Sequence, residues 1–203
     1  MKILMMGPPA CGKGTIGEML SKELRIPLVS TGQLLRNLTP NSPWYAEMYK
    51  AMASGNLAPN EHVAEVLKQE LKKDKYASGY ILDGWVRQMS DLQFFNPGFD
   101  KVVLLEVSED TTFKRISGRR VCDVDGKNYN IYLMTADELK NCPGRLTQRA
   151  DDHEDIVKTR LELYRNRTEE AIKYFEREGI LLRINAEGPP DEVLQKVLSE
   201  LGK

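Results

Sequence analysis

The first fifteen residues constrain the fold of this chain more than any other stretch. Ile3 to Met6 form an apolar run that predicts a short buried strand, and the run breaks at Gly7. A loop follows and ends in Gly12-Lys13-Gly14-Thr15, after which apolar residues recur at helical spacing. This order of strand, loop and helix predicts a phosphate-binding loop, because backbone amides and a helix N-terminus attract an anion. Lys13 adds a mobile positive charge for the outer phosphates of a nucleotide.

Short apolar runs alternate with helical patterns along the rest of the chain. Val102 to Val107 give the strongest strand signal, and a run that is apolar on both faces suits a parallel sheet covered by helices. The alternation predicts an α/β fold with a central parallel sheet. Further strands are expected at residues 28–29, 80–82 and 180–184, and helices at 16–24, 34–36, 44–52, 60–71, 109–116, 151–178 and 190–201.

Periodicity is lost between Arg119 and about Leu146, where Gly, Asn, Asp and Pro interrupt the pattern. We interpret this stretch as an insert with little core of its own.

Composition limits the class of protein. The 203 residues suit one domain with small inserted lobes. With 29 basic and 30 acidic residues, net charge gives no argument for a nucleic acid or membrane partner. No apolar run approaches the ~20 residues that cross a bilayer, and the opening strand leads directly into the loop without a leader-like segment. We expect a cytoplasmic monomer with small-molecule partners.

The cysteines carry little signal. Cys11, Cys122 and Cys142 are too few and too scattered to indicate a disulfide framework. We therefore expect free thiols in a reducing compartment.

Ligands of open parallel sheets bind beyond the carboxyl ends of the strands. The phosphate loop, the segment Asp83 to Arg87 and the segment Asn185 to Gly188 each follow a predicted strand. An Asp beside a phosphate loop suits Mg²⁺ or its waters, with helix capping as the alternative. Arg87 favours phosphate binding, because guanidinium groups grip phosphate oxygens bidentately. Other arginines with the same potential are Arg36, Arg115, Arg119, Arg120, Arg149 and Arg160.

These motifs together resemble the adenylate kinase family. Gly7 to Thr15 resembles its phosphate loop, in which Gly-Lys-Gly-Thr is the usual form. Ser30 to Arg36 resembles its nucleoside-monophosphate segment, and Leu82 to Arg87 resembles its Leu-Asp-Gly-Phe-Pro-Arg segment. The two edges of the family's lid resemble Gly118-Arg119-Arg120 and Leu146 to Asp152. The arginine that the family carries in the following helix is matched by Arg160.

The resemblance implies a three-layer α/β/α fold with a central parallel sheet and two inserted lobes. The core would comprise residues 1–29, 60–118 and 153–203, the helical nucleoside-monophosphate lobe residues 30–59, and the lid residues 119–152. The implied activity is phosphoryl transfer from ATP·Mg²⁺ to AMP, which gives two ADP.

The resemblance also assigns roles to residues. ATP would be bound by Gly7, Pro8, Gly12, Lys13, Gly14, Thr15, Arg115, Arg119, Ala186 and Gly188. AMP would be bound by Thr31, Gly32, Arg36, Leu57, Ala58, Gly84, Arg87, Asp91, Arg149 and Arg160. The catalytic set would be Lys13, Arg87, Arg119, Arg149 and Arg160. Asp83 would anchor Mg²⁺ through water, and Asp151 and Asp152 would tie the closed lid and its arginines.

Three departures from the family pattern limit what the resemblance implies. Gln33 replaces a family Asp, so one carboxylate near Mg²⁺ is missing, and Trp85-Val86 replaces Phe-Pro. Asp91 stands where the family has an adenine-reading Gln, and a carboxylate cannot donate to a ring nitrogen. Because Thr31 matches the adenylate-type residue, we favour AMP, with CMP or UMP as the alternative acceptor.

Many lids of this type hold zinc with four ligands. Here Cys122, Asp125 and Cys142 would supply at most three, whereas a structural zinc site uses four. We expect hydrogen bonds and packing to hold the lid, with zinc as the alternative. A nucleotide-binding module without catalysis is a further alternative, and the retained Lys13, Asp83 and arginines argue against it.

Overall fold

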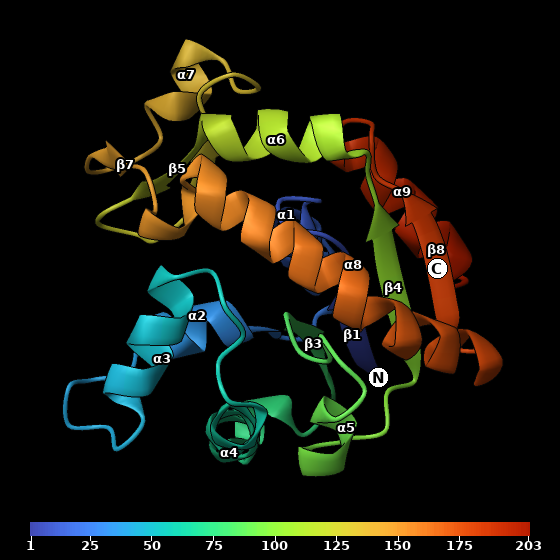
Figure 1. Ribbon diagram of the computed structural model, residues 1–203. Helices are drawn as coiled ribbons and strands as arrows, with labels where there is room; N and C mark the ends of the chain where they lie inside the picture. Colours follow the sequence, from blue (N-terminus) through green and yellow to red (C-terminus); the bar gives the residue numbers. More distant parts are fainter.

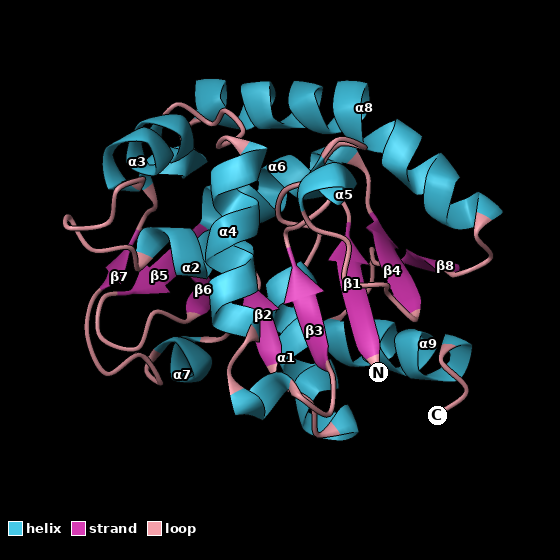
Figure 2. Ribbon diagram, turned by 90° about the horizontal axis from the view of Figure 1, so that it is seen from below, coloured by secondary structure: helices cyan, strands magenta, loops and turns pink.

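The computed structural model describes residues 1–203 as a parallel sheet between two layers of helices (Figure 1, Figure 2). The sheet has the order β2-β3-β1-β4-β8, and all its pairings are parallel. Its strands are β1 (Lys2–Met6), β2 (Leu28–Ser30), β3 (Tyr80–Asp83), β4 (Lys101–Glu106) and β8 (Leu181–Asn185). The predicted α/β/α fold with a central parallel sheet is confirmed.

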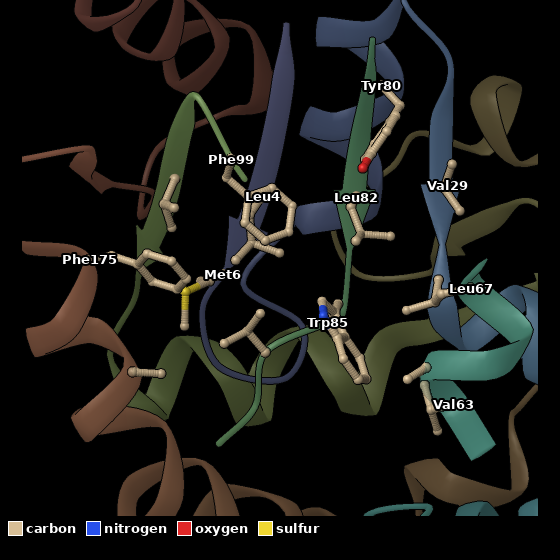
Figure 3. Close-up of a cluster of buried hydrophobic side chains, with 14 of the residues drawn as sticks. Leu4, Met6, Val29, Val63, Leu67, Tyr80, Leu82, Trp85, Phe99 and Phe175 are labelled. Atoms are coloured by element: carbon tan, nitrogen blue, oxygen red, sulfur yellow. The ribbon is translucent and has the colours of Figure 1, made fainter. Parts of the chain in front are cut away.

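Side chains along β1 alternate between the two faces of the sheet, as the two-residue period of a strand requires. Leu4 and Met6 belong to one buried cluster, and Ile3 and Met5 to another. The first cluster includes residues from α4 (Asn60–Leu71) and α8 (Glu154–Arg177), and Figure 3 shows Leu4 and Met6 with Phe175 of α8 on one side and Leu67 of α4 on the other. The second includes residues from α1 (Lys13–Leu24) and α9 (Pro190–Glu200).

The remaining elements lie around this core. Ser108 caps the helix α6 (Glu109–Gly118) by accepting a hydrogen bond from the Thr111 amide, as its position before the helix predicts. These elements are α2 (Thr31–Arg36), α3 (Tyr45–Ala53), η1 (Asp74–Tyr76), α5 (Asp91–Phe94), α6 (Glu109–Gly118) and η2 (Ala150–Asp152).

The stretch in which the sequence loses its periodicity folds into a second, antiparallel sheet. Its order is β6-β5-β7, formed by β5 (Arg119–Cys122), β6 (Asn128–Asn130) and β7 (Leu146–Thr147), with α7 (Ala136–Leu139) between the last two. Cys122 and Tyr129 are the buried hydrophobic residues of the insert, and neither belongs to the clusters of the main core.

The prediction for the cysteines is wrong for two of the three. Cys122 and Cys142 form a disulfide that closes a loop with a sequence separation of 20, and only Cys11 is free. Three cysteines do not reveal which pair the fold brings together, whereas here the two Cα atoms lie 5.8 Å apart.

None of the helices combines the length and the apolar character that crossing a membrane requires.

Candidate functional site: a cleft at the carboxyl ends of the strands

The loop between β1 and α1 is shaped by glycines. Gly7 has a φ of 140°, and a Cβ there would collide with the carbonyl of Leu105. Gly12 has a φ of 108° and precedes the first turn of α1. A residue with a side chain would strain the loop at either position. The loop therefore keeps its backbone amides close to the start of the helix, as anion binding requires.

Lys13 folds back over this loop. Its Nζ donates to the carbonyls of Gly7 and Pro8, both at 2.8 Å, and lies 3.4 Å from the Sγ of Cys11. These partners are neutral, so no carboxylate in the loop competes with an anion for the side chain of Lys13.

Arg115 joins the loop to the segment after β8. Its guanidinium donates to the carbonyl of Cys11 at 3.0 Å and to that of Ala186 at 2.8 Å. Two segments far apart in the sequence are thus held side by side at the edge of the sheet. The guanidinium lies where the resemblance implies one end of the ATP site.

A cleft of about 1130 Å³ opens in front of the loop. Figure 1 shows β5 and β7 on the same side of the molecule as α2 and α3. The cleft brings together most of the predicted site residues. They are Gly7, Gly12, Lys13, Gly14, Thr15, Thr31, Gly32, Arg36, Leu57, Ala58, Asp83, Gly84, Arg87, Asp91, Arg115, Arg119, Asp125, Arg149, Asp151, Arg160, Ala186 and Gly188.

Four predicted residues do not line the cleft. Pro8 offers its carbonyl to Lys13 from behind the loop. Asp152 is buried behind Arg119. Cys122 and Cys142 form a disulfide and are not among the residues that line the cleft.

Five arginines from separate elements face this cleft: Arg36, Arg87, Arg119, Arg149 and Arg160. Burial lowers the pKa of Arg160 to about 10, with the charges of Arg119 and Arg87 contributing. Burial also lowers the pKa of Arg149 to about 10, and here the charges of Arg119 and Arg36 contribute. Guanidinium groups held this close repel one another, so the cleft is built to receive a ligand with several negative charges.

Two aspartates of η2, just before α8, orient part of this cluster. Asp152 accepts from both Nε and Nη2 of Arg119, and Arg160 donates to the Asp151 carboxylate at 2.8 Å. Burial alone would raise the pKa of Asp151, but the charges of Arg160, Arg119 and Arg149 hold it below its usual value. The Asp151 carboxylate therefore remains ionised at neutral pH, and the hydrogen bonds of the two aspartates fix the two guanidinium planes.

The opposite end of the cleft lies between α2 and the segment after β3. Thr31 is 3% exposed, and its Oγ1 has no hydrogen-bond partner within the protein. Gly84 has a φ of +86°, and a Cβ there would lie 3.5 Å from Arg87 and 3.7 Å from Thr31. A buried hydroxyl without a partner costs free energy, which a bound ligand can recover.

Asp91 has a structural role that the sequence did not indicate. It is 4% exposed, and its Oδ2 accepts from the backbone amides of Arg87 at 2.7 Å and Gln88 at 3.2 Å. Burial raises the pKa of Asp91, and these hydrogen bonds oppose that shift. One carboxylate oxygen is thus committed to the turn that carries Arg87.

The residues at the end of β3 fit a hydrated Mg²⁺ rather than a direct protein cage. Asp83 ends β3 in the cleft and accepts a 3.5 Å hydrogen bond from Ser30, so its carboxylate remains available to water. Gln33 donates to Asn37 one turn further along α2. No group of three or more His, Cys, Asp or Glu side chains is placed to hold a metal ion. A single carboxylate beside a phosphate loop suits a metal carried mainly by substrate phosphates and water.

The candidate zinc ligands are not assembled for zinc. A disulfide joins Cys122 and Cys142, and oxidised sulfur does not supply the thiolate that zinc binds. Asp125 pairs instead with Lys127 at 3.4 Å.

Three functional positions carry no signal in the sequence. Asn128 on β6 accepts a hydrogen bond from Nη2 of Arg149, Asn130 donates to the carbonyl of Arg115, and Thr168 on α8 donates to the carbonyl of Arg87. Each contact joins residues that are between 15 and 81 positions apart. Only the folded chain shows them.

Comparison with known proteins agrees with the fold and the cleft. The family model for adenylate kinase matches residues 5–180. The adenylate kinase of Syntrophotalea carbinolica is 36% identical over 100% of this chain and 99% of its own length. Those of Clostridium kluyveri and Streptomyces coelicolor are 34% and 35% identical, over 100% and 99% of this chain and 98% of their own lengths.

The fold and the cleft are those of a phosphate-loop phosphotransferase that acts on nucleoside monophosphates. More particularly, the chain belongs to the adenylate kinase family.

Proposed function

We propose that this protein catalyses reversible phosphoryl transfer from ATP·Mg²⁺ to AMP, giving two ADP. The observation that carries the proposal is the meeting of five arginines and the phosphate loop in one cleft. ATP and AMP placed end to end bring four phosphates and up to about six negative charges to this region. The transfer breaks the bond between the γ-phosphorus and its bridging oxygen, leaving ADP, and forms a new bond to an oxygen of the AMP phosphate.

At the donor end, the phosphate loop and Lys13 hold the ATP phosphates. Arg115 and the backbone from Ala186 to Gly188 flank the adenine. Asp83 would hold a bound Mg²⁺, which would neutralise charge on the ATP phosphates. Pre-positioned charges and close alignment of the two substrates account for the rate, because no side chain has to act as nucleophile or base.

At the acceptor end, Arg36 and Arg87 grip the phosphate of the monophosphate. Arg119, Arg149 and Arg160 neutralise charge on the transferring group. The buried Oγ1 of Thr31 has no protein partner and is free to bind the acceptor. Asp91 acts on the acceptor through the turn that carries Arg87, because its Oδ2 is used by that turn.

Two lobes, residues 30–59 and 119–152, close over the substrates. The two lobes approach each other at Gly126, where a Cβ would lie 3.9 Å from Nε2 of Gln33. The lid also approaches the phosphate loop, since a Cβ on Gly14 would lie 3.9 Å from Nδ2 of Asn128. Closure excludes water, which would otherwise accept the phosphoryl group.

A coupled assay of ADP formation tests the proposal. ATP·Mg²⁺ is offered with AMP, CMP, UMP or GMP in turn, and the highest kcat/KM is expected for AMP. A higher kcat/KM for CMP would replace the adenylate assignment with a pyrimidine monophosphate kinase. Absence of turnover with all four acceptors would favour a nucleotide-binding module without catalysis.

A further inference from the structure

Arg149 differs from its neighbours in how its side chain is held. Arg119 is paired with Asp152 and Arg160 with Asp151, whereas Arg149 forms no ion pair. Its one side-chain hydrogen bond is the contact from Nη2 to the Oδ1 of Asn128. Arg149 is thus held by a neutral group, in a cleft whose burial and positive charges already lower its pKa to about 10.

Asn128 reaches Arg149 from the facing part of the lid. It begins β6, where it pairs with Val121 of β5, whereas Arg149 directly precedes η2. The two residues are 21 positions apart. Asn128 also lines the cleft, and its Nδ2 points to the phosphate loop, 3.9 Å from where a Cβ on Gly14 would stand. The amide therefore lies between the guanidinium of Arg149 and the loop.

An amide at this position does what a carboxylate could not do. A carboxylate would orient the guanidinium, but it would also neutralise it and repel the phosphates nearby. The amide oxygen accepts the same hydrogen bond and leaves the full positive charge directed at the cleft. The fork geometry of arginine is useful only when its plane is fixed.

We infer that Asn128 is a positioning residue of the lid, which holds the guanidinium of Arg149 toward the transferring phosphoryl group without compensating its charge. This inference rests on the proposed phosphoryl transfer. It adds a requirement for a neutral acceptor at residue 128.

The test compares Asn128→Ala and Asn128→Asp with the wild type in the ATP plus AMP assay. Loss of a hydrogen bond to a charged group predicts a kcat about 10- to 100-fold lower in Asn128→Ala. Asn128→Asp, which keeps the acceptor and adds charge, should lose at least as much. The KM for ATP should stay near the wild-type value, because the loop and Lys13 are untouched. Asn128 is exposed, so both variants should unfold at the wild-type temperature.

Asn141→Asp is the matched control, since it makes the same chemical change at an exposed lid position outside the cleft. It should leave kcat unchanged. The double variant tests whether Asn128 acts through Arg149. In a protein that already carries Arg149→Ala, the further change Asn128→Ala should not lower kcat again.

Two results would overturn the inference: a wild-type kcat in Asn128→Asp, or an undiminished effect of Asn128→Ala in the Arg149→Ala background. Failure of the proposed function itself is recognised separately, since the wild-type protein would then turn over no monophosphate.

Discussion

The carboxylate of Asp152 accepts two hydrogen bonds from the guanidinium of Arg119, and its side chain has no solvent exposure. The pair links β5 of the lid to the turn before α8, 33 positions along the chain. Both residues lie at the ends of the proposed lid, residues 119–152, so the pair ties these two ends together, and it fixes one of the arginines of the cleft.

Replacement of Asp152 should reveal this link. Asp152→Asn keeps the shape but leaves Arg119 without its counter-charge, and breaking a buried pair from one side costs about 3–5 kcal/mol. We expect a lower free energy of unfolding in urea, together with a lower kcat. Asp137→Asn is the control, because its carboxylate is 89% exposed and its pair with Lys140 lies on the surface. Equal unfolding midpoints for the two variants would contradict the assignment.

Lys13 is predicted to act in catalysis and not in folding. Its Nζ contacts only its own loop, so Lys13→Met should leave thermal unfolding nearly unchanged. Loss of a charge directed at the transition state should lower kcat by about 100-fold or more. The exposed Lys22 of the same helix provides the control substitution Lys22→Met. If Lys13→Met turned over at the rate of that control, the loop would not be the phosphate site.

Asp91 offers a test between two roles for one residue. If it acts through the turn that carries Arg87, Asp91→Ala should raise the KM for every monophosphate by a similar factor, about 10-fold for the lost hydrogen bonds to a carboxylate. If it reads the base directly, the ratio of kcat/KM for AMP to that for CMP should change instead. We expect the first result, since Oδ2 is shared by two backbone amides.

The disulfide of the lid should contribute to stability. A loop of this length, with a sequence separation of 20, gives about 3 kcal/mol in the chain-entropy account. Reduction of the disulfide by dithiothreitol should therefore lower the unfolding temperature of the wild-type protein. The double variant Cys122→Ser, Cys142→Ser should show no such response. If dithiothreitol did not change the unfolding temperature of the wild-type protein, that result would count against the disulfide.

The central sheet could be predicted from the sequence because its strands are buried on both faces. The apolar runs around Leu4, Leu82 and Leu104 have no polar alternation to obscure them, and polar residues follow where each strand ends. The phosphate loop could be predicted because its backbone requires glycine at residues 7 and 12, where φ is positive. Glycines required by the backbone of a loop recur at a fixed spacing in the sequence.

The lid could not be predicted in the same way. Its strands have two to four residues, and β6 (Asn128–Asn130) has one apolar residue between two asparagines. So short a segment shows no period, and its stability comes from the neighbouring strand and the disulfide. The same holds for the site: residue types indicated Arg149 as a phosphate ligand, but only the fold shows that Asn128 holds it. Nor could the sequence separate a base-reading Asp91 from one that supports a turn.

The central claim is that the cleft passes a phosphoryl group directly from ATP to a nucleoside monophosphate. The most direct measurement follows the label when the protein is incubated with Mg²⁺, AMP and ATP labelled at its γ-phosphate. The account predicts label in the β-phosphate of ADP formed from AMP, with little in inorganic phosphate while AMP is present. Label released chiefly as inorganic phosphate, or retained in ATP, would contradict it.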